Sequence, residues 1–123
     1  MILGISALFA PVFPQVNDNA AMQPVVETAS GKVKGFIEEG TMAFKGIPYA
    51  RTERFMPPMP VDRWEGVRLS TEWGPQAMQG GRNSNNPKEM SEDCCVLNVW
   101  TTSLDTKKPV MLWCHGGGFD SGN

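Results

Sequence analysis

The strongest constraint on the fold is an apolar run at residues 110–114 (VMLWC), which leads directly into His115 and three consecutive glycines at 116–118. A short, nearly continuous apolar run is typical of a strand that is covered on both faces of a sheet. Glycines after such a strand let the backbone approach a bound group closely, because no Cβ stands in the way. The pattern therefore predicts a central strand that carries a glycine loop at its end.

The three glycines suit the binding of a small anion. Two convergent backbone N–H groups would stabilise the oxyanion that forms when a carbonyl is attacked. The alternative is a simple flexible turn, which is disfavoured because each glycine adds an entropic cost of about 0.5–1 kcal/mol. His115 is the chain's single histidine. Because no serine or cysteine has an evident activating context, we expect His115 to shape the loop or to hydrogen-bond nearby backbone, not to act as a catalytic base.

The segment after residue 24 alternates short apolar runs with glycine-containing turns. Residues 25–28 and 32–37 read as two strands joined by a turn at Ser30 and Gly31, and residues 41–47 read as a third strand. Together they predict an antiparallel meander. A further strand is expected at 95–101, where β-branched and aromatic residues are frequent.

The middle of the chain, residues 48–87, is rich in proline and glycine. Prolines block helices and weaken strands, so this segment is expected to be irregular. Trp64 and Trp73 are expected to pin it to a core, because tryptophan buries a large area. The polar stretch 79–93 reads as an exposed loop. No convincing amphipathic helix is present anywhere in the sequence.

The N-terminal 23 residues stand apart in composition. Residues 2–10 are apolar, but this stretch is shorter than the roughly 20 residues that span a bilayer. It resembles the hydrophobic region of a secretory signal peptide, although no Lys or Arg precedes it. Residues 1–23 are therefore expected to be a signal-peptide remnant or a disordered tail. The first alternative would make the protein secreted or periplasmic.

Charge and cysteine content exclude several classes of protein. The net charge of -2 and the interspersed acidic and basic residues argue against a nucleic-acid-binding protein. The cysteines Cys94, Cys95 and Cys114 lack the spacing of a zinc site. We expect them to be buried free thiols, and we expect neither a metal nor a cofactor.

Six stretches of the chain follow one another in the order and spacing of a known family. They read GKVKGF, FKGIPYA, RFMPPMPVDRWEGV, WGPQAMQ, SEDCCVLNVW and KPVMLWCHGGGFDSGN. On these motifs, residues 24–123 resemble the N-terminal part of the type-B carboxylesterases, the family that includes the cholinesterases, and RFMPPMPV is similar to bacterial members. The resemblance implies an α/β fold: the N-terminal portion of an α/β-hydrolase, in which the antiparallel meander leads into the central sheet, truncated before the nucleophile elbow.

The resemblance also implies an activity. The family hydrolyses carboxylic esters of small molecules with a Ser–His–Glu/Asp triad. By this likeness, Gly117 and Gly118 would donate their backbone N–H groups to the oxyanion, and Gly116 would support the loop. Glu92 and Asp93 would have a structural role with buried polar contacts.

Two departures from the family pattern modify this expectation. The chain contains no G-x-S-x-G motif, so residues 24–123 are expected to form a partial domain without nucleophile, acid or base, inactive on its own. The alternative is a non-catalytic, cholinesterase-like binding or adhesion module. In addition, the usual disulfide partner of Cys94 is replaced by Ala77, and a disulfide with the adjacent Cys95 would be strained.

Overall fold

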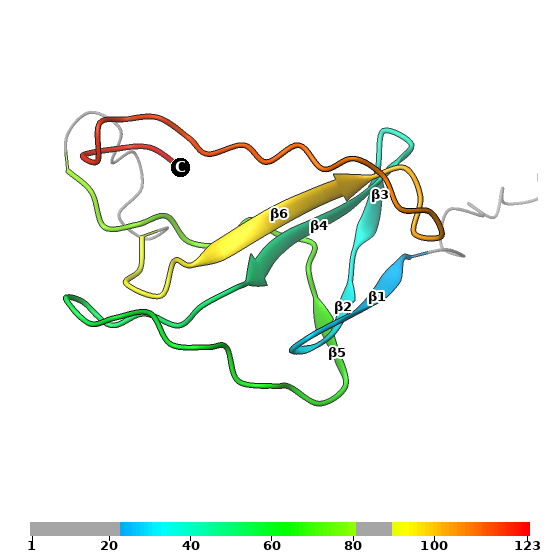
Figure 1. The fold of residues 1–123 in the computed structure, drawn as a ribbon, viewed down its shortest axis with the longest axis horizontal. Helices are drawn as coiled ribbons and strands as arrows, with labels where there is room; N and C mark the ends of the chain where they lie inside the picture. Colours follow the sequence, from blue (N-terminus) through cyan, green and yellow to red (C-terminus); the bar gives the residue numbers. More distant parts are fainter. Residues whose placement is uncertain (1–22, 81–89) are drawn as a thin grey trace, which may run out of the picture.

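The computed structural model describes residues 23–80 and 90–123, which form two three-stranded sheets and, within these ranges, no helix (Figure 1). One sheet has the order β1-β2-β5, with β1 at Val25–Thr28, β2 at Gly31–Lys34 and β5 at Val67–Leu69. The other has the order β3-β4-β6, with β3 at Phe36–Glu38, β4 at Thr41–Pro48 and β6 at Val96–Thr101. The predicted signal segment or tail at 1–23 and most of the predicted loop at 79–93 lie outside the described residues.

The predicted antiparallel pairing is confirmed, because β1 pairs with β2 and β3 pairs with β4 in antiparallel register. The structure divides the predicted strand 32–37 at Gly35, where the chain passes from one sheet to the other. A Cβ at Gly35 would lie 2.2 Å from the carbonyl oxygen of Ala43 and 2.7 Å from the Phe44 ring. Glycine therefore allows the backbone to cross β4 closely, and Val33, Ala43 and Phe44 form the buried core beside this crossing.

The irregular middle segment contains one strand that sequence reasoning missed, β5, which pairs in parallel with β2. Trp64 precedes it, and its indole Nε1 donates a hydrogen bond of 2.9 Å to the carbonyl of Lys32. A Cβ at Gly31 would lie 2.6 Å from the same Nε1 atom. Trp64 thus pins this segment as predicted, but it attaches it to the β1–β2 hairpin, since its half-buried side chain is not part of the buried core.

The same prediction is wrong for Trp73, whose side chain is 64% exposed. Its ring lies 5.8 Å from that of Trp100 on β6 and covers the ammonium group of Lys45 at 4.5 Å. Trp73 therefore shields a charged side chain at the surface and does not fill the core.

Lys45 is the one buried charged residue among those described. Its Nζ lies 2.6 Å from Glu38 Oε1 and 5.0 Å from the centre of the Phe36 ring. The second carboxylate oxygen of Glu38 accepts a 2.9 Å hydrogen bond from Trp100 Nε1. The ammonium group is thus paired and partly enclosed by aromatic rings, which offsets its removal from water.

This arrangement predicts a dependence of stability on pH. The hydrogen bond from Lys45, and then that from Trp100, hold the pKa of Glu38 below its ordinary value. A lowered pKa stabilises the fold above the unfolded value of about 4.3, and this contribution is lost as the pH falls through the folded pKa. We expect Glu38→Gln to remove the part of the acid-induced loss of stability that comes from Glu38. Urea unfolding across the acidic pH range measures the free energy of unfolding that shows this. Glu39→Gln, in the neighbouring turn, is the control and should keep the wild-type pH profile.

The predicted central strand at 110–114 is not formed in this structure. No backbone hydrogen bond joins these residues to any other described residue, and Val110, Met111, Leu112 and Trp113 are 83% to 93% exposed. Figure 1 shows this segment as an extended coil between β6 and the C-terminal loop. A strand needs a hydrogen-bonding partner on at least one edge, and the described residues provide none here.

All three cysteines are free. Cys94 and Cys95 are half-buried, and burial followed by the neighbouring Cys95 raises the pKa of the Cys94 thiol. The expectation of burial is wrong for Cys114, which is exposed because the apolar run that contains it is not covered by a sheet.

Candidate functional site

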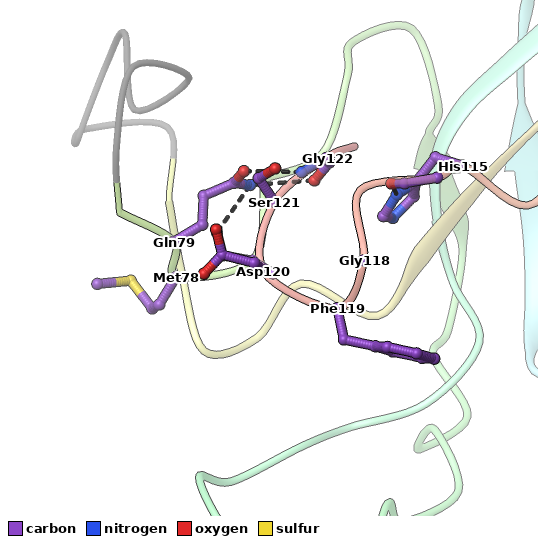
Figure 2. A pocket seen from close by; sticks show the side chains of 10 residues that line it. Met78, Gln79, His115, Gly118, Phe119, Asp120, Ser121 and Gly122 are labelled. Carbon is purple, nitrogen blue, oxygen red and sulfur yellow. Dashed lines mark hydrogen bonds between the residues drawn. The ribbon is translucent and has the colours of Figure 1, made fainter.

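The glycine loop and the segment 77–79 together line a pocket of about 450 Å³ (Figure 2). The lining consists of residues 77–79, 115–116 and 118–122. These two segments are far apart in the sequence and meet at the C-terminal end of the described chain. Gly116 and Gly118 therefore border a concave site, as a ligand-binding loop requires.

Gly117 has a backbone conformation that only glycine adopts readily. Its φ is 124°, and a Cβ on it would lie 1.6 Å from the carbonyl oxygen of Ser121. Gly118 has a φ of 63°, in the left-handed region, and the following Phe119 has the same φ of 63°. The loop thus reverses direction within three residues, which requires glycine at 117 and favours it at 118.

Gly116 differs from its two neighbours. Its φ is not positive, and a Cβ on it would meet nothing within 4 Å. Local sterics therefore do not require glycine at this position, in contrast to Gly117.

The reversal determines which polar groups of the loop are engaged. The carbonyl of Gly117 accepts hydrogen bonds from the N–H groups of Asp120, at 3.1 Å, and Ser121, at 3.3 Å. The N–H groups of Gly117 and Gly118 donate to no described residue. The loop thus has two neighbouring N–H donors without a partner in the part of the chain that the structure describes.

His115 contacts the backbone of its own loop, in agreement with the expectation drawn for it. Its Nδ1 lies 2.8 Å from the carbonyl oxygen of Gly116, so the proton of this bond is carried by Nδ1. A Cβ at Gly122 would lie 2.5 Å from the same nitrogen. The imidazole thus packs between the two ends of the loop.

Sequence reasoning missed Gln79, the polar side chain that holds the loop. Its Nε2 donates to the carbonyl of Gly122 at 3.0 Å, and its Oε1 accepts from the N–H of the same glycine at 2.9 Å. The signal available in the sequence was its place at the end of the WGPQAMQ motif, but its partner lies 43 residues away.

The expectation of buried polar contacts for Glu92 and Asp93 is wrong, since both residues are exposed. Glu92 forms an ion pair with Arg54 at 3.4 Å, and its backbone carbonyl accepts a hydrogen bond from the Thr52 hydroxyl at 2.7 Å. No described segment covers the two carboxylates, so they lie at the surface.

Residues 23–80 and 90–123 contain no group of three or more His, Cys, Asp or Glu side chains that could hold a metal ion. They also contain no helix with the length and apolar character needed to cross a bilayer.

Comparison with known proteins gives consistent matches. The profile of the carboxylesterase family matches residues 22–123. The phenmedipham hydrolase of Pseudarthrobacter oxydans is 34% identical over a 113-residue alignment that covers 82% of this chain and 23% of that protein. Liver carboxylesterase B-1 of Rattus norvegicus is 35% identical over a 129-residue alignment that covers 85% of this chain and 23% of that protein.

Solved structures agree with these matches. An esterase from Clostridium hathewayi, described as able to hydrolyse aliphatic aromatic polyesters, superposes with a TM-score of 0.73 at 43% identity, covering 80% of this chain and 22% of that one. A Geobacillus stearothermophilus carboxylesterase gives 0.68 at 44% identity, covering 80% and 20%. These neighbours are α/β-hydrolases, which confirms the predicted fold class. The chain spans between a fifth and a quarter of the length of these proteins.

Proposed function

The chain belongs to the carboxylesterase family, and on that premise we propose that it provides the oxyanion-stabilising loop of an enzyme that hydrolyses carboxylic esters of small molecules. The N–H groups of Gly117 and Gly118 would be the two donors. Gly116 would connect them to the preceding extended segment. The chain itself contains no G-x-S-x-G motif, so the proposal assigns it the electrostatic part of the reaction and not the nucleophile.

The proposed chemistry follows from the charge that develops at the ester carbonyl. When a serine attacks the carbonyl carbon, the π electrons move to the carbonyl oxygen, which becomes an oxyanion. Donors that already point at that position stabilise the transition state without reorganisation, and each is worth about 10²–10³ in kcat. A third donor would come from the residue after the nucleophile, and the histidine base would be a different residue from His115.

The observation that carries the proposal is the conformation of Gly117. Its positive φ and the 1.6 Å approach of a hypothetical Cβ to the Ser121 carbonyl oxygen mean that only glycine fits this conformation. The same conformation leaves the N–H groups of Gly117 and Gly118 without a partner among the described residues. A glycine-dependent loop beside a pocket, with unpaired backbone donors, suits the binding of an anionic oxygen.

A graft tests the proposal. Residues 22–123 would replace the matching segment of the Geobacillus stearothermophilus carboxylesterase, which is 44% identical over the aligned region. We expect the graft to hydrolyse a p-nitrophenyl ester, and we expect a serine-directed organophosphate to stop the turnover. The isolated 123-residue chain should show no turnover above background.

The matched control is the same graft with the parent's nucleophilic serine replaced by alanine. If the graft folds with a cooperative melt but hydrolyses the ester no faster than this control, the proposal fails. That result would favour the alternative of a non-catalytic, cholinesterase-like binding or adhesion module.

A further inference from the structure

We infer that Gln79 is a positioning residue for the glycine loop: its carboxamide anchors Gly122 and thereby holds Gly117 and Gly118 in the conformation that leaves their N–H groups free. The effect on loop conformation stands by itself. Its consequence for ester hydrolysis rests on the proposed function.

The carboxamide of Gln79 is fully matched to the backbone of Gly122. The side chain donates from Nε2 to the glycine carbonyl at 3.0 Å and accepts at Oε1 from the glycine N–H at 2.9 Å. Nε2 also donates to the carbonyl of Ala77 at 3.3 Å, which orients the amide group. Figure 2 shows Gln79 reaching across the pocket to Gly122. One amide side chain thus pairs with a backbone amide as a neighbouring strand would.

This pairing is the main attachment of the loop. Within the described part of the chain, the two bonds to Gln79 are the only hydrogen bonds that tie residues 115–123 to any other segment. The preceding residues 110–114 are exposed and unpaired, so they do not restrain the loop from its other side. Without Gln79, the remaining hydrogen bonds of the loop are internal to it.

Close packing transmits the position of Gly122 to the glycine triplet. A Cβ at Gly122, whose φ is 122°, would lie 2.5 Å from the carbonyl oxygen of Gly116. A Cβ at Gly117 would meet the carbonyl of Ser121, the residue before Gly122. The returning end of the loop therefore lies directly against its first two glycines, so Gly122 cannot shift without displacing them.

The chemistry at position 79 requires both a donor and an acceptor. Glutamate at this position would keep an oxygen that accepts from the Gly122 N–H. When ionised, however, its other carboxylate oxygen would face the Gly122 carbonyl oxygen and repel it. When protonated, it would donate to that carbonyl again. Methionine would keep the approximate shape and lose both hydrogen bonds.

Hydrogen–deuterium exchange of the intact chain, resolved to single amides by mass spectrometry, tests the inference at micromolar concentration. In Gln79→Met we expect the Gly122 amide to exchange about 10-fold faster than in the wild type, as the loss of one or two ordinary hydrogen bonds implies. The amides of Asp120 and Ser121, which close the turn on Gly117, should exchange faster as well. Gln76→Met is the matched control, because the Gln76 side chain hydrogen-bonds to no described residue.

Gln79→Glu separates positioning from simple destabilisation. Exchange at Gly122 should match the wild type at acidic pH and become faster as the pH rises through the pKa of the introduced carboxyl. His115 and Asp120 line the same pocket, so each rate is divided by the wild-type rate at the same pH. A structural role alone would not restore protection on protonation.

Two results would overturn the inference. One is unchanged exchange at Gly122 in Gln79→Met; the other is a pH-independent ratio in Gln79→Glu. If Gln79→Met also loses protection in β4 and β6, the variant is destabilised as a whole, and the pH dependence of exchange in Gln79→Glu becomes the deciding test.

In the graft, Gln79→Met should lower kcat and leave KM unchanged. If the graft is inactive but Gln79→Met alters exchange in the chain, the proposed function is rejected and the role of Gln79 is retained. If the graft is active but Gln79→Met leaves exchange unaltered, the proposed function is retained and the role of Gln79 is rejected.

Discussion

Replacing Gly117 by alanine in the grafted esterase is expected to lower kcat by about 10²–10³-fold, the effect of losing one oxyanion donor, with little change in KM. The added Cβ would lie 1.6 Å from the carbonyl oxygen of Ser121, and the φ of 124° disfavours any side chain. The loop must then open, which moves the N–H groups of Gly117 and Gly118. Steady-state kinetics on a p-nitrophenyl ester measures the effect.

Two other glycines provide graded comparisons for Gly117→Ala. Gly116→Ala should cost less, because a Cβ there meets nothing within 4 Å. Gly80→Ala, also in open space and outside the glycine triplet, should leave kcat unchanged. Equal losses for Gly116→Ala and Gly117→Ala would contradict the loop geometry described above.

The largest expected effect on stability is that of Phe44→Ala, which should lower the free energy of unfolding by about 3–5 kcal/mol. Phe44 is 3% exposed and lies under the backbone crossing at Gly35, so no neighbouring side chain can readily fill the cavity. Because the buried apolar core of the described chain contains only Val33 and Ala43 besides Phe44, this loss is a large part of the total. Urea unfolding followed by tryptophan fluorescence would measure it.

Phe55→Ala is the matched control for Phe44→Ala, since Phe55 is 93% exposed. It should change the free energy of unfolding by less than about 0.5 kcal/mol. Similar losses for the two phenylalanine variants would show that Phe44 is not the centre of the core.

Local patterns were sufficient to predict most strands. Short apolar runs between glycine-containing turns correctly located β1 and β4, and β-branched content located β6, because each of these signals depends only on neighbouring residues. The family was also recognisable from short motifs. The three-residue β5 was missed because its parallel pairing with β2 depends on a segment more than 30 residues away, to which no local signal points.

Errors arose where burial depends on what covers a segment. Residues 110–114 have the composition of a central strand, yet no described strand pairs with them. Cys114 is exposed for the same reason. Trp73 and Glu92 likewise lie at the surface. Composition predicts the preference of a side chain for burial, whereas the packing of distant segments decides whether it is buried.

The sequence by itself determined the presence of a glycine loop after an apolar run, and with it the family and the candidate donors Gly117 and Gly118. Only the tertiary structure decided that these residues differ from Gly116, and that Gln79 anchors the loop through Gly122. The physical reason is that glycine permits many backbone conformations, so its presence allows a loop shape without selecting it. The selection comes from two hydrogen bonds and close contacts between segments distant in the chain.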